Sequence, residues 1–361
     1  MPTLRQRALQ EYLRDRFGPE ATLLSYRVIG KASSKGEQKR YGYGTPVKLT
    51  FRLGRRVQSA VLETMRPGPF GHEHMADRAQ AMLWDYDSYG RLARHVKTLD
   101  VGAFNGKQAL LSVAEAREFF VLNEWAEGAS YHLDLERLAK GHTLRPVDRQ
   151  RTLALARYLS EIHAVKRRDA DLYKRRLREL IGHGECIMGL TDSYPKQYGF
   201  ITGDLLRTIE DACNRWRWRL RDKTGRLSQV HGDFHPYNVL FRTGAEFSVL
   251  DRSRGEWGEP ADDVTAMTIN YLLSSLIRWG KLRGPFEVLF RLFWDTYLEA
   301  SGDKGVTGTA APFFAFRGLV VASPVWYPTL SIDVRRSLFR FIETVLDAPR
   351  FEPERVNEYC R

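Results

Sequence analysis

The 361-residue sequence lacks the features of disulfide-bonded, zinc-binding and membrane-spanning proteins. It has three cysteines, Cys186, Cys213 and Cys360, which are widely spaced and form no CxxC pair. This usage argues against a disulfide framework or a zinc site and favours a reducing compartment. No run of about 18 apolar residues appears, and the first residues lack the apolar core of a signal peptide. We therefore expect a cytoplasmic protein with no membrane partner.

Lysine and arginine outnumber aspartate and glutamate, which gives a formal net charge of +12. Such a balance can indicate nucleic acid, an anionic membrane surface or a phosphorylated ligand as partner. The positive charge is spread along the chain, without a basic tail. Residues 215–221 (RWRWRLR) interleave aromatic and basic side chains, as some nucleic-acid sites do. Because they continue the stripe of a predicted helix, we interpret them as a solvated face and do not expect nucleic acid as a partner.

The N-terminal third has short β-branched and aromatic runs separated by glycine-bearing segments. Residues 4–13 have helical spacing, and residues 72–92 predict an amphipathic helix with Met75, Ala79, Met82, Leu83 and Tyr86 on one face. Strands are expected at residues 23–29, 47–53, 57–65, 108–113 and 118–122. This part predicts a mainly antiparallel sheet with one main packed helix.

A polar segment between the first two predicted strands contains Gly30, Ser33, Ser34, Lys35 and Gly36. A strand, a glycine-containing loop and a second strand can wrap nucleotide phosphates with backbone N–H groups. The segment does not match GxGxxG. A surface hairpin without a ligand is the alternative interpretation.

Beyond residue 128 the pattern becomes helical. The helices are expected at residues 149–165, 203–220, 264–278, 285–300 and 335–346. The sequence therefore predicts an α+β protein with two lobes. Residues 1–125 form a small, antiparallel, β-rich lobe, residues 126–361 form a larger, mainly helical lobe, and the connection lies near residues 123–128.

The most informative stretch is residues 230–241, VHGDFHPYNVLF. It places Asp233 in an irregular loop and Asn238 directly before a predicted strand, while a second apolar run, 247–250, ends at Asp251. A carboxylate in such a loop can accept a proton from an attacking hydroxyl. An amide and a carboxylate at neighbouring strand ends offer the oxygen ligands that Mg²⁺ prefers beside phosphate oxygens. A base, an amide and a carboxylate are the side chains that phosphoryl transfer requires at a minimum.

The spacing His231-Gly-Asp233-x-x-x-x-Asn238, followed by Leu250-Asp251 and by GEPADDV at 258–264, resembles the aminoglycoside phosphotransferase and choline kinase family. The resemblance extends over roughly residues 20 to 275 and includes a helix ending LSEIHA at 159–164. It implies the protein-kinase-like fold. The segment FFVLNEWAEG at 119–128 is similar to the connection between the lobes of that family.

The resemblance implies a role for each matching residue. Asp233 would be the catalytic base, His231 would hold the loop, Asn238 and Asp251 would bind Mg²⁺, and Asp263 would brace the catalytic loop. For the histidines and for Asp263, purely structural roles, such as a helix N-cap, are the alternatives. ATP would bind through the backbone of Glu124 and Ala126 and through the glycine-bearing loop, whose members are Gly30, Ser33, Ser34, Lys35 and Gly36.

The sequence departs from the family at two positions. Glu63 stands near the place of the strand lysine that contacts the nucleotide phosphates, and Glu259 stands where the family usually has Asp. A charge-exchanged pair between Glu63 and Arg78 is one hypothesis for the first departure. The phosphates would then need another cation, for which Lys48, Lys35 and Arg66 are the candidates.

We therefore expect an ATP- and Mg²⁺-dependent kinase that phosphorylates a hydroxyl of a small molecule. Residues 167–228 contain 14 Lys and Arg against nine Asp and Glu. If they line the acceptor site, they would repel a polycation, which favours a neutral or anionic sugar, polyol or amino alcohol. The alternatives are a pseudokinase-like nucleotide-binding or regulatory module, and a kinase acting on protein or RNA. The sequence does not indicate the oligomeric state.

Overall fold

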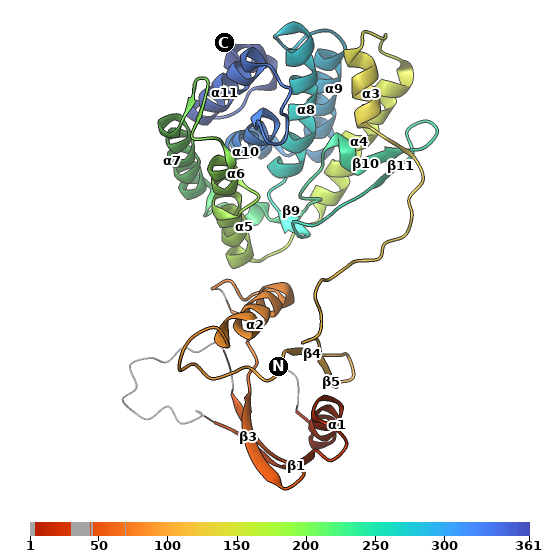
Figure 1. Ribbon diagram of the computed structural model, residues 1–361. Helices are drawn as coiled ribbons and strands as arrows, with labels where there is room; N and C mark the ends of the chain where they lie inside the picture. The colour runs from red at the N-terminus through yellow and green to blue at the C-terminus, as the bar shows by residue number, and fades with distance from the viewer. Residues whose placement is uncertain (1–3, 30–43, 45, 69) are drawn as a thin grey trace. The chain divides into compact units, whose positions relative to one another are not determined.

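The computed structural model describes residues 4–29, 44, 46–68 and 70–361. The chain divides into two compact units, Met1–Asn123 and Glu124–Arg361. The first combines a small antiparallel sheet with two helices, and the second is mainly helical (Figure 1). The predicted α+β class is confirmed. Among the described residues, no helix is both long and apolar enough to cross a membrane.

A three-stranded antiparallel sheet forms the centre of the first unit. Its strands are β1 (Thr22–Val28), β2 (Val47–Leu53) and β3 (Arg56–Leu62), in the order β1-β2-β3. Strands β2 and β3 form the predicted hairpin, with Lys48 opposite Val61. Alternate residues of β2 are buried, as expected for a sheet with one face against a core.

Helix α1 (Gln6–Phe17) covers the buried face of this sheet. Its Leu9 and Leu13, both at most 1% exposed, pack in one apolar cluster with β2 residues. The cluster contains Leu9, Leu13, Ala21, Leu23, Val47, Leu49 and Phe51. The helical spacing of apolar residues near the N-terminus therefore predicted both the helix and its packing face.

Two expectations for the rest of the first unit are wrong. Helix α2 (Met75–Tyr89) forms, but it contains no buried residue, and Met75 on the predicted packing face is 79% exposed. The short strands β4 (Gly102–Phe104) and β5 (Leu110–Ser112) pair with each other, whereas residues 118–122 form no strand. Phe120 and Leu122 are about 90% exposed. An apolar run becomes a strand only where a partner strand accepts its backbone hydrogen bonds.

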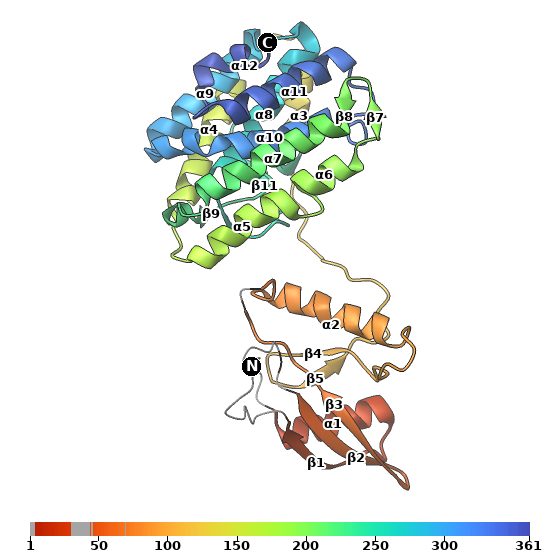
Figure 2. The same cartoon turned by 90° about the vertical axis from the view of Figure 1, so that its left-hand side faces the viewer.

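The second unit contains ten α-helices among the described residues (Figure 2). The five predicted ones appear within a few residues of their expected ends, and shorter or more buried ones were not predicted. Their bounds are α3 (His132–Ala139), α4 (Pro146–Ala164), α5 (Ala170–Gly182), α6 (Ile187–Ser193), α7 (Gly203–Leu220), α8 (Ala261–Trp279), α9 (Gly284–Ser301), α10 (Ala310–Ala322), α11 (Ile332–Asp347) and α12 (Val356–Tyr359).

Helix α10 lies at the centre of this bundle, in contact with α6, α7, α8 and α11. Nearly every one of its residues is buried. Because its sequence, AAPFFAFRGLVVA, is apolar on all sides, it shows no amphipathic period. Its one charged residue, Arg317, is buried with the rest.

Short strands flank the bundle and carry the motif residues. Strand β10 (Val239–Phe241) lies between β11 (Phe247–Val249) and β6 (Ala129–Ser130), and β9 (Ser228–Gln229) pairs with β12 (Trp257–Gly258). Residues 230–238 connect β9 to β10. Both ends of the motif loop are therefore fixed in small sheets.

Candidate functional site

Strands β10 and β11 bring two of the predicted site residues to one edge. They pair antiparallel with Val239 opposite Val249, so the start of β10 lies beside the end of β11. Asn238 directly precedes β10, and the N–H of Leu250 donates to its carbonyl oxygen at 2.9 Å. Asp251 follows Leu250. The backbones at Asn238 and Asp251 are therefore neighbours.

Both side chains can offer oxygen to a cation. The Nδ2 group of Asn238 donates to the carbonyl oxygen of Asp233 at 3.1 Å, which leaves Oδ1 as the ligand atom. Asp251 is exposed and has φ 56°, a left-handed conformation that Asp adopts more readily than most residues. An amide and a carboxylate oxygen fit Mg²⁺, which completes its shell with phosphate oxygens and water. The described residues contain no cluster of three or more His, Cys, Asp or Glu able to bind a metal.

Asp263, in the first turn of α8, holds the start of the motif loop. It is fully buried, and its two oxygens accept the backbone N–H groups of His231 and Gly232 at 2.7 Å each. The Nε2 atom of His163 lies 3.1 Å from Oδ2. Burial by itself raises the pKa of Asp263, but hydrogen bonding to His163 outweighs it, and the pKa lies below its ordinary value. An ionised carboxylate therefore fixes two successive residues of the loop.

The two histidines of the motif make local contacts. The Nδ1 atom of His231 accepts the N–H of Asp233 at 3.3 Å, and burial lowers the pKa of this histidine. The Nδ1 atom of His235 accepts the N–H of Tyr237 at 3.2 Å. Its Nε2 atom lies 3.5 Å from Oδ2 of Asp233. These contacts are those of residues that shape a loop.

Asp233 is 15% exposed at its side chain, and its Oδ1 atom lies 2.5 Å from Nη1 of Arg317. Burial by itself would raise the pKa of Asp233. Hydrogen bonding to His235 and the charges of Arg317 and Arg254 outweigh burial and hold the pKa well below its usual range. Asp233 is thus an oriented carboxylate that stays ionised.

Arg317 was not predicted from the sequence, although it contacts the loop most closely. Its side chain is 6% exposed, and Nη2 donates to the carbonyl oxygen of Gly232 at 2.9 Å and to Oδ1 of Asp262 at 2.5 Å. One guanidinium thus links two carboxylates and the loop backbone. The sequence sign that could have revealed this residue is a single arginine inside an otherwise apolar run. An arginine in such a run is buried on folding, and a buried charge requires partners.

The departure at Glu259 is accommodated by a second buried arginine. Glu259 is 2% exposed and accepts hydrogen bonds from Arg226 at 2.6 to 2.9 Å, from Tyr173 at 2.9 Å and from Thr309 at 3.1 Å. Arg226 also binds Asp303 at 2.8 Å. This network joins α5, α8 and the loop before α10, so the longer carboxylate has a structural role.

The predicted nucleotide residues divide into described and undescribed ones. Glu124 and Ala126 lie in an extended segment without secondary structure, at the start of the second unit. The members of the glycine-bearing loop lie outside the described residues; they are Gly30, Ser33, Ser34, Lys35 and Gly36.

The hypothesis of a pair between Glu63 and Arg78 is wrong. Glu63 is exposed just beyond β3 and forms no ion pair within the described part of the chain. Arg78 instead donates to the carbonyl oxygens of His72, Glu73 and His74 at 2.8 to 3.0 Å. Those three bonds tie the loop before α2 to its first turns.

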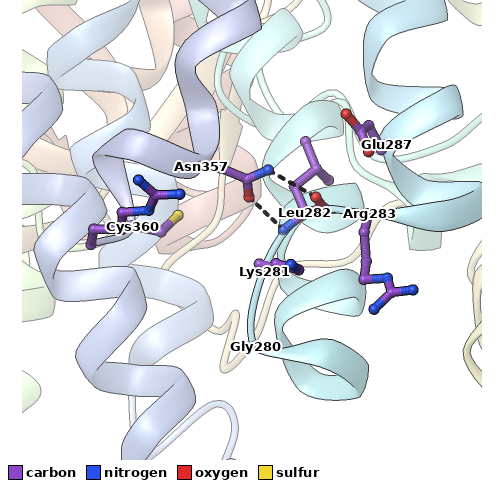
Figure 3. A pocket seen from close by; sticks show the side chains of 8 residues that line it. Gly280, Lys281, Leu282, Arg283, Glu287, Asn357 and Cys360 are labelled. Atoms are coloured by element: carbon purple, nitrogen blue, oxygen red, sulfur yellow. Dashed lines mark hydrogen bonds between the residues drawn. The ribbon is translucent and has the colours of Figure 1, made fainter.

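A cavity of about 440 Å³ lies apart from all of these residues, beside α8, α9 and α12. Its floor is formed where Asn357 exchanges two hydrogen bonds with the backbone of Leu282, at 2.8 and 2.9 Å (Figure 3). None of the motif residues lines it. Exposed charged side chains, among them Lys281 and Arg283, form much of its rim.

Solved structures and curated proteins were compared with the chain. The chain resembles the amicoumacin kinase hAmiN (15% identity, 98% of each chain covered, TM-score 0.43). It also resembles choline kinase from Cryptosporidium parvum Iowa II (9% identity, 99% and 92% covered, TM-score 0.34) and a spectinomycin phosphotransferase (12% identity, 100% and 98% covered, TM-score 0.35). No curated protein sequence matches the chain.

A family model gives the assignment. The model described as the phosphotransferase enzyme family, APH, matches residues 76–284, which is more than half of the 361 residues. The match includes the whole motif loop, both strands β10 and β11, and Asp263. The resemblance inferred from the sequence is therefore confirmed. The chain belongs to the APH phosphotransferase enzyme family.

Proposed function

We propose that this phosphotransferase transfers the γ-phosphoryl group of ATP to a hydroxyl of a small molecule, with Asp233 as the base. One observation carries the proposal. Strands β10 and β11 bring Asn238 and Asp251 together, and the Asn238 side chain hydrogen-bonds the backbone of Asp233 at 3.1 Å. A base and two oxygen ligands on one connected segment are what phosphoryl transfer to a hydroxyl requires.

Asp233 orients the acceptor hydroxyl more than it deprotonates it. A carboxylate whose pKa is held low by Arg317 is a weak base at neutral pH. Transition states of phosphoryl transfer are loose, so the proton leaves the hydroxyl late and a strong base is not needed. The 2.5 Å contact with Arg317 fixes the direction of the carboxylate. Positioning of this kind lowers the barrier by reducing the entropy lost on reaction.

Asn238 Oδ1 and the Asp251 carboxylate would hold Mg²⁺. A bound ion would supply neutralisation of charge on the transferred phosphoryl group. Neither side chain needs to change partners for this, because Asn238 uses its Nδ2 group for Asp233. The exposed Asp251 is accessible to the ion.

For the nucleotide, we propose the backbone of Glu124 and Ala126 as the adenine contacts and residues 30–36 as the phosphate loop. Among the cations suggested to replace the strand lysine, we favour Lys48. It lies opposite Val61 in the β2–β3 pair, so its side chain is on the same face of the sheet as Val61. Glu63 follows directly after β3, which ends at Leu62.

The acceptor is proposed to be neutral or anionic. Residues 167–228, which form α5, α6 and α7, carry the excess of basic over acidic side chains counted in the sequence. This excess disfavours a polycation such as an aminoglycoside. A sugar, polyol or amino alcohol without several positive charges fits better.

A phosphate-transfer screen over sugars, amino alcohols, nucleosides and aminoglycosides tests the proposal. With the acceptor so found, Asp233→Asn should lower kcat/KM by at least about 100-fold, because it removes the proton acceptor and the charge that orients the hydroxyl. Asp347→Asn, at the exposed end of α11, is the matched control and should leave activity unchanged. Full activity of Asp233→Asn would refute the assignment.

A nucleotide-binding module without turnover is the second candidate, and the observation that favours it is the exposed Glu63 at the lysine position. Thermal denaturation with ATP and Mg²⁺ separates the two. Stabilisation by ATP together with no transfer to any acceptor, and ATPase activity no higher than that of Asp233→Ala, would favour the module. The cytoplasmic location inferred from the sequence stays a prediction.

A further inference from the structure

Three arginines around the motif loop have a buried Nε–H group without a hydrogen-bond partner within the described structure. They are Arg176, Arg254 and Arg317. Leaving a donor of a charged group buried and unsatisfied is costly, and native proteins do so rarely. When such donors gather at one place, a ligand oxygen is their natural acceptor.

Arg254 lies beside the loop backbone that precedes the proposed base. Gly232 has φ +86°, and a Cβ built on it would lie 3.3 Å from Cβ of Arg254. The next residue after Gly232 is Asp233. Arg254 therefore stands beside the carboxylate proposed to orient the acceptor hydroxyl.

Unlike Arg317, Arg254 makes no ion pair shorter than 3.9 Å within the described structure. Its Nη2 atom is 3.9 Å from Glu185, whose side chain is 67% exposed, and its Nη1 atom is 3.9 Å from Sγ of the buried Cys186. The guanidinium lies 4.9 Å from the ring centroid of Phe316. An aromatic ring supports a cation but takes none of its hydrogen bonds. The guanidinium of Arg254 is therefore held in place, and its N–H groups can still donate hydrogen bonds to a ligand.

Arg176 brings a second guanidinium to the same place. A Cβ on Gly255, the residue after Arg254, would lie 2.5 Å from Nη2 of Arg176, so the guanidinium packs directly on that glycine. Arg175 and Arg176 both bind Glu179, at 2.6 Å each. The Nε–H of Arg176 remains without an acceptor within the described structure.

We propose that Arg254, assisted by Arg176, forms an oxyanion site beside Asp233 that binds a carboxylate or phosphate group of the acceptor. This inference rests on the proposed function, since it names the chemical class of that acceptor. A guanidinium presents paired N–H groups that match two oxygens of such a group. The acceptor is then an anionic alcohol, in which the hydroxyl is presented to Asp233 and the charged group to Arg254.

Binding of inorganic phosphate, measured by calorimetry and by thermal denaturation, tests the site without requiring turnover. Wild type should bind phosphate, and Arg254→Gln should weaken binding by about tenfold or more, since hydrogen bonds to charged groups carry that much affinity. Arg291→Gln is the matched control: it removes one positive charge from α9, where Arg291 pairs with Glu287 at 3.1 Å. Equal binding by Arg254→Gln and wild type, or no binding by wild type, would overturn the proposal.

Two further experiments guard against misfolding of Arg254→Gln and against phosphate binding at the nucleotide site. Arg254→Lys retains the charge and should fold even if Arg254→Gln does not; it should bind phosphate more weakly than wild type, and equal binding would contradict the proposal. The second experiment repeats the titration with saturating AMP-PNP and Mg²⁺. Phosphate binding that persists indicates a site for the acceptor, whereas binding that disappears assigns Arg254 to the nucleotide phosphates and overturns the acceptor class.

The same variants distinguish this inference from the proposed function. If Arg254 binds phosphate but no phosphoryl transfer is found, the oxyanion site stands and the kinase assignment fails. If transfer depends on Asp233 but is equally fast for Arg254→Gln, with KM for the acceptor unchanged, the kinase assignment stands and the anionic acceptor is refuted.

Discussion

The loop that carries Asp233 is held by buried charged side chains, whereas the outer face of the β1–β3 sheet carries exposed residues with few polar partners. In the helical unit, Asp263 and Arg317 are at most 5% exposed and bind the loop backbone directly. In the first unit, Glu63 is exposed and Val61 is 50% exposed. The loop that carries Asp233 is thus fixed by buried charged side chains, while Glu63 stays exposed and makes no ion pair within the described part of the chain.

The largest effect is expected from breaking the Asp263 contacts. Asp263→Asn replaces an acceptor of two backbone N–H groups by an amide that cannot accept all of its bonds. The free energy of unfolding in urea should fall by about 3 kcal/mol or more, because donors are left buried without partners. Asp211→Asn, exposed on α7, should change it by less than about 0.5 kcal/mol. A loss below 1 kcal/mol for Asp263→Asn, at about the size of the control, would contradict the role of Asp263.

Removal of Arg317 should have the next largest effect and should also shift the pH dependence of activity. Arg317→Met leaves Asp233 and Asp262 as neighbouring carboxylates without their cation, and we expect a loss of about 2–3 kcal/mol in urea unfolding. Because Arg317 lowers the pKa of Asp233, its removal should raise that pKa. The acid limb of kcat/KM should therefore move to higher pH.

Arg317→Lys is the matched variant for this test. It keeps the positive charge, so the acid limb should stay close to that of the wild type even if stability falls. An unchanged pH profile for Arg317→Met would show that Asp233 does not sense this charge.

A smaller effect is expected in the pH dependence of stability. The pKa of Asp263 is lower in the folded than in the unfolded chain, so its contribution is complete above the unfolded pKa and is lost as pH falls toward the folded one. The stability difference between wild type and Asp263→Asn should be constant above about pH 5 and shrink below about pH 4. Urea unfolding of both proteins from pH 7 to pH 3 measures it. A difference that is equal at pH 3 and pH 7 would show that the carboxylate charge is not the source.

The smallest effect belongs to the first unit. Glu63→Ala should change the free energy of unfolding by less than about 0.5 kcal/mol, because an exposed side chain without an ion pair contributes little. Leu49→Ala, in the buried face of the same sheet, should cost about 2–4 kcal/mol by comparison and serves as the positive control. A loss above 1 kcal/mol for Glu63→Ala would reveal a structural role for the glutamate.

The elements that could be predicted from the sequence are those whose pattern is local. Helices α4 and α7 have one apolar stripe each, and strands β10 and β11 are bounded by the polar residues of the site. Helix α10 has no stripe, since it is apolar on all sides. Residues 118–122 have a strand-like composition but pair with no strand of the described structure. The composition of a segment does not show whether a partner strand is available.

The candidate site also contains residues that a local sequence pattern predicts and residues that it does not. The spacing of Asp233, Asn238 and Asp251 is set within 19 residues of chain, so a sequence pattern contains it. Arg317 reaches Asp233 from 84 residues further along the chain. A contact at that separation depends on how the helices pack, and its only local sign is a charge inside an apolar run. The strength with which the loop is held could therefore not be predicted from the motif.

The hydrogen bond between Asn238 and the backbone of Asp233 explains the choice of an amide at position 238. A carboxylate would offer a cation more charge, but it has no N–H to donate to the carbonyl oxygen of Asp233. Asp at this position would face that oxygen with like charge and push the two apart. The amide gives up part of the electrostatic attraction for the proposed ion and gains a hydrogen bond to the Asp233 backbone, so whatever fixes Asn238 also fixes Asp233.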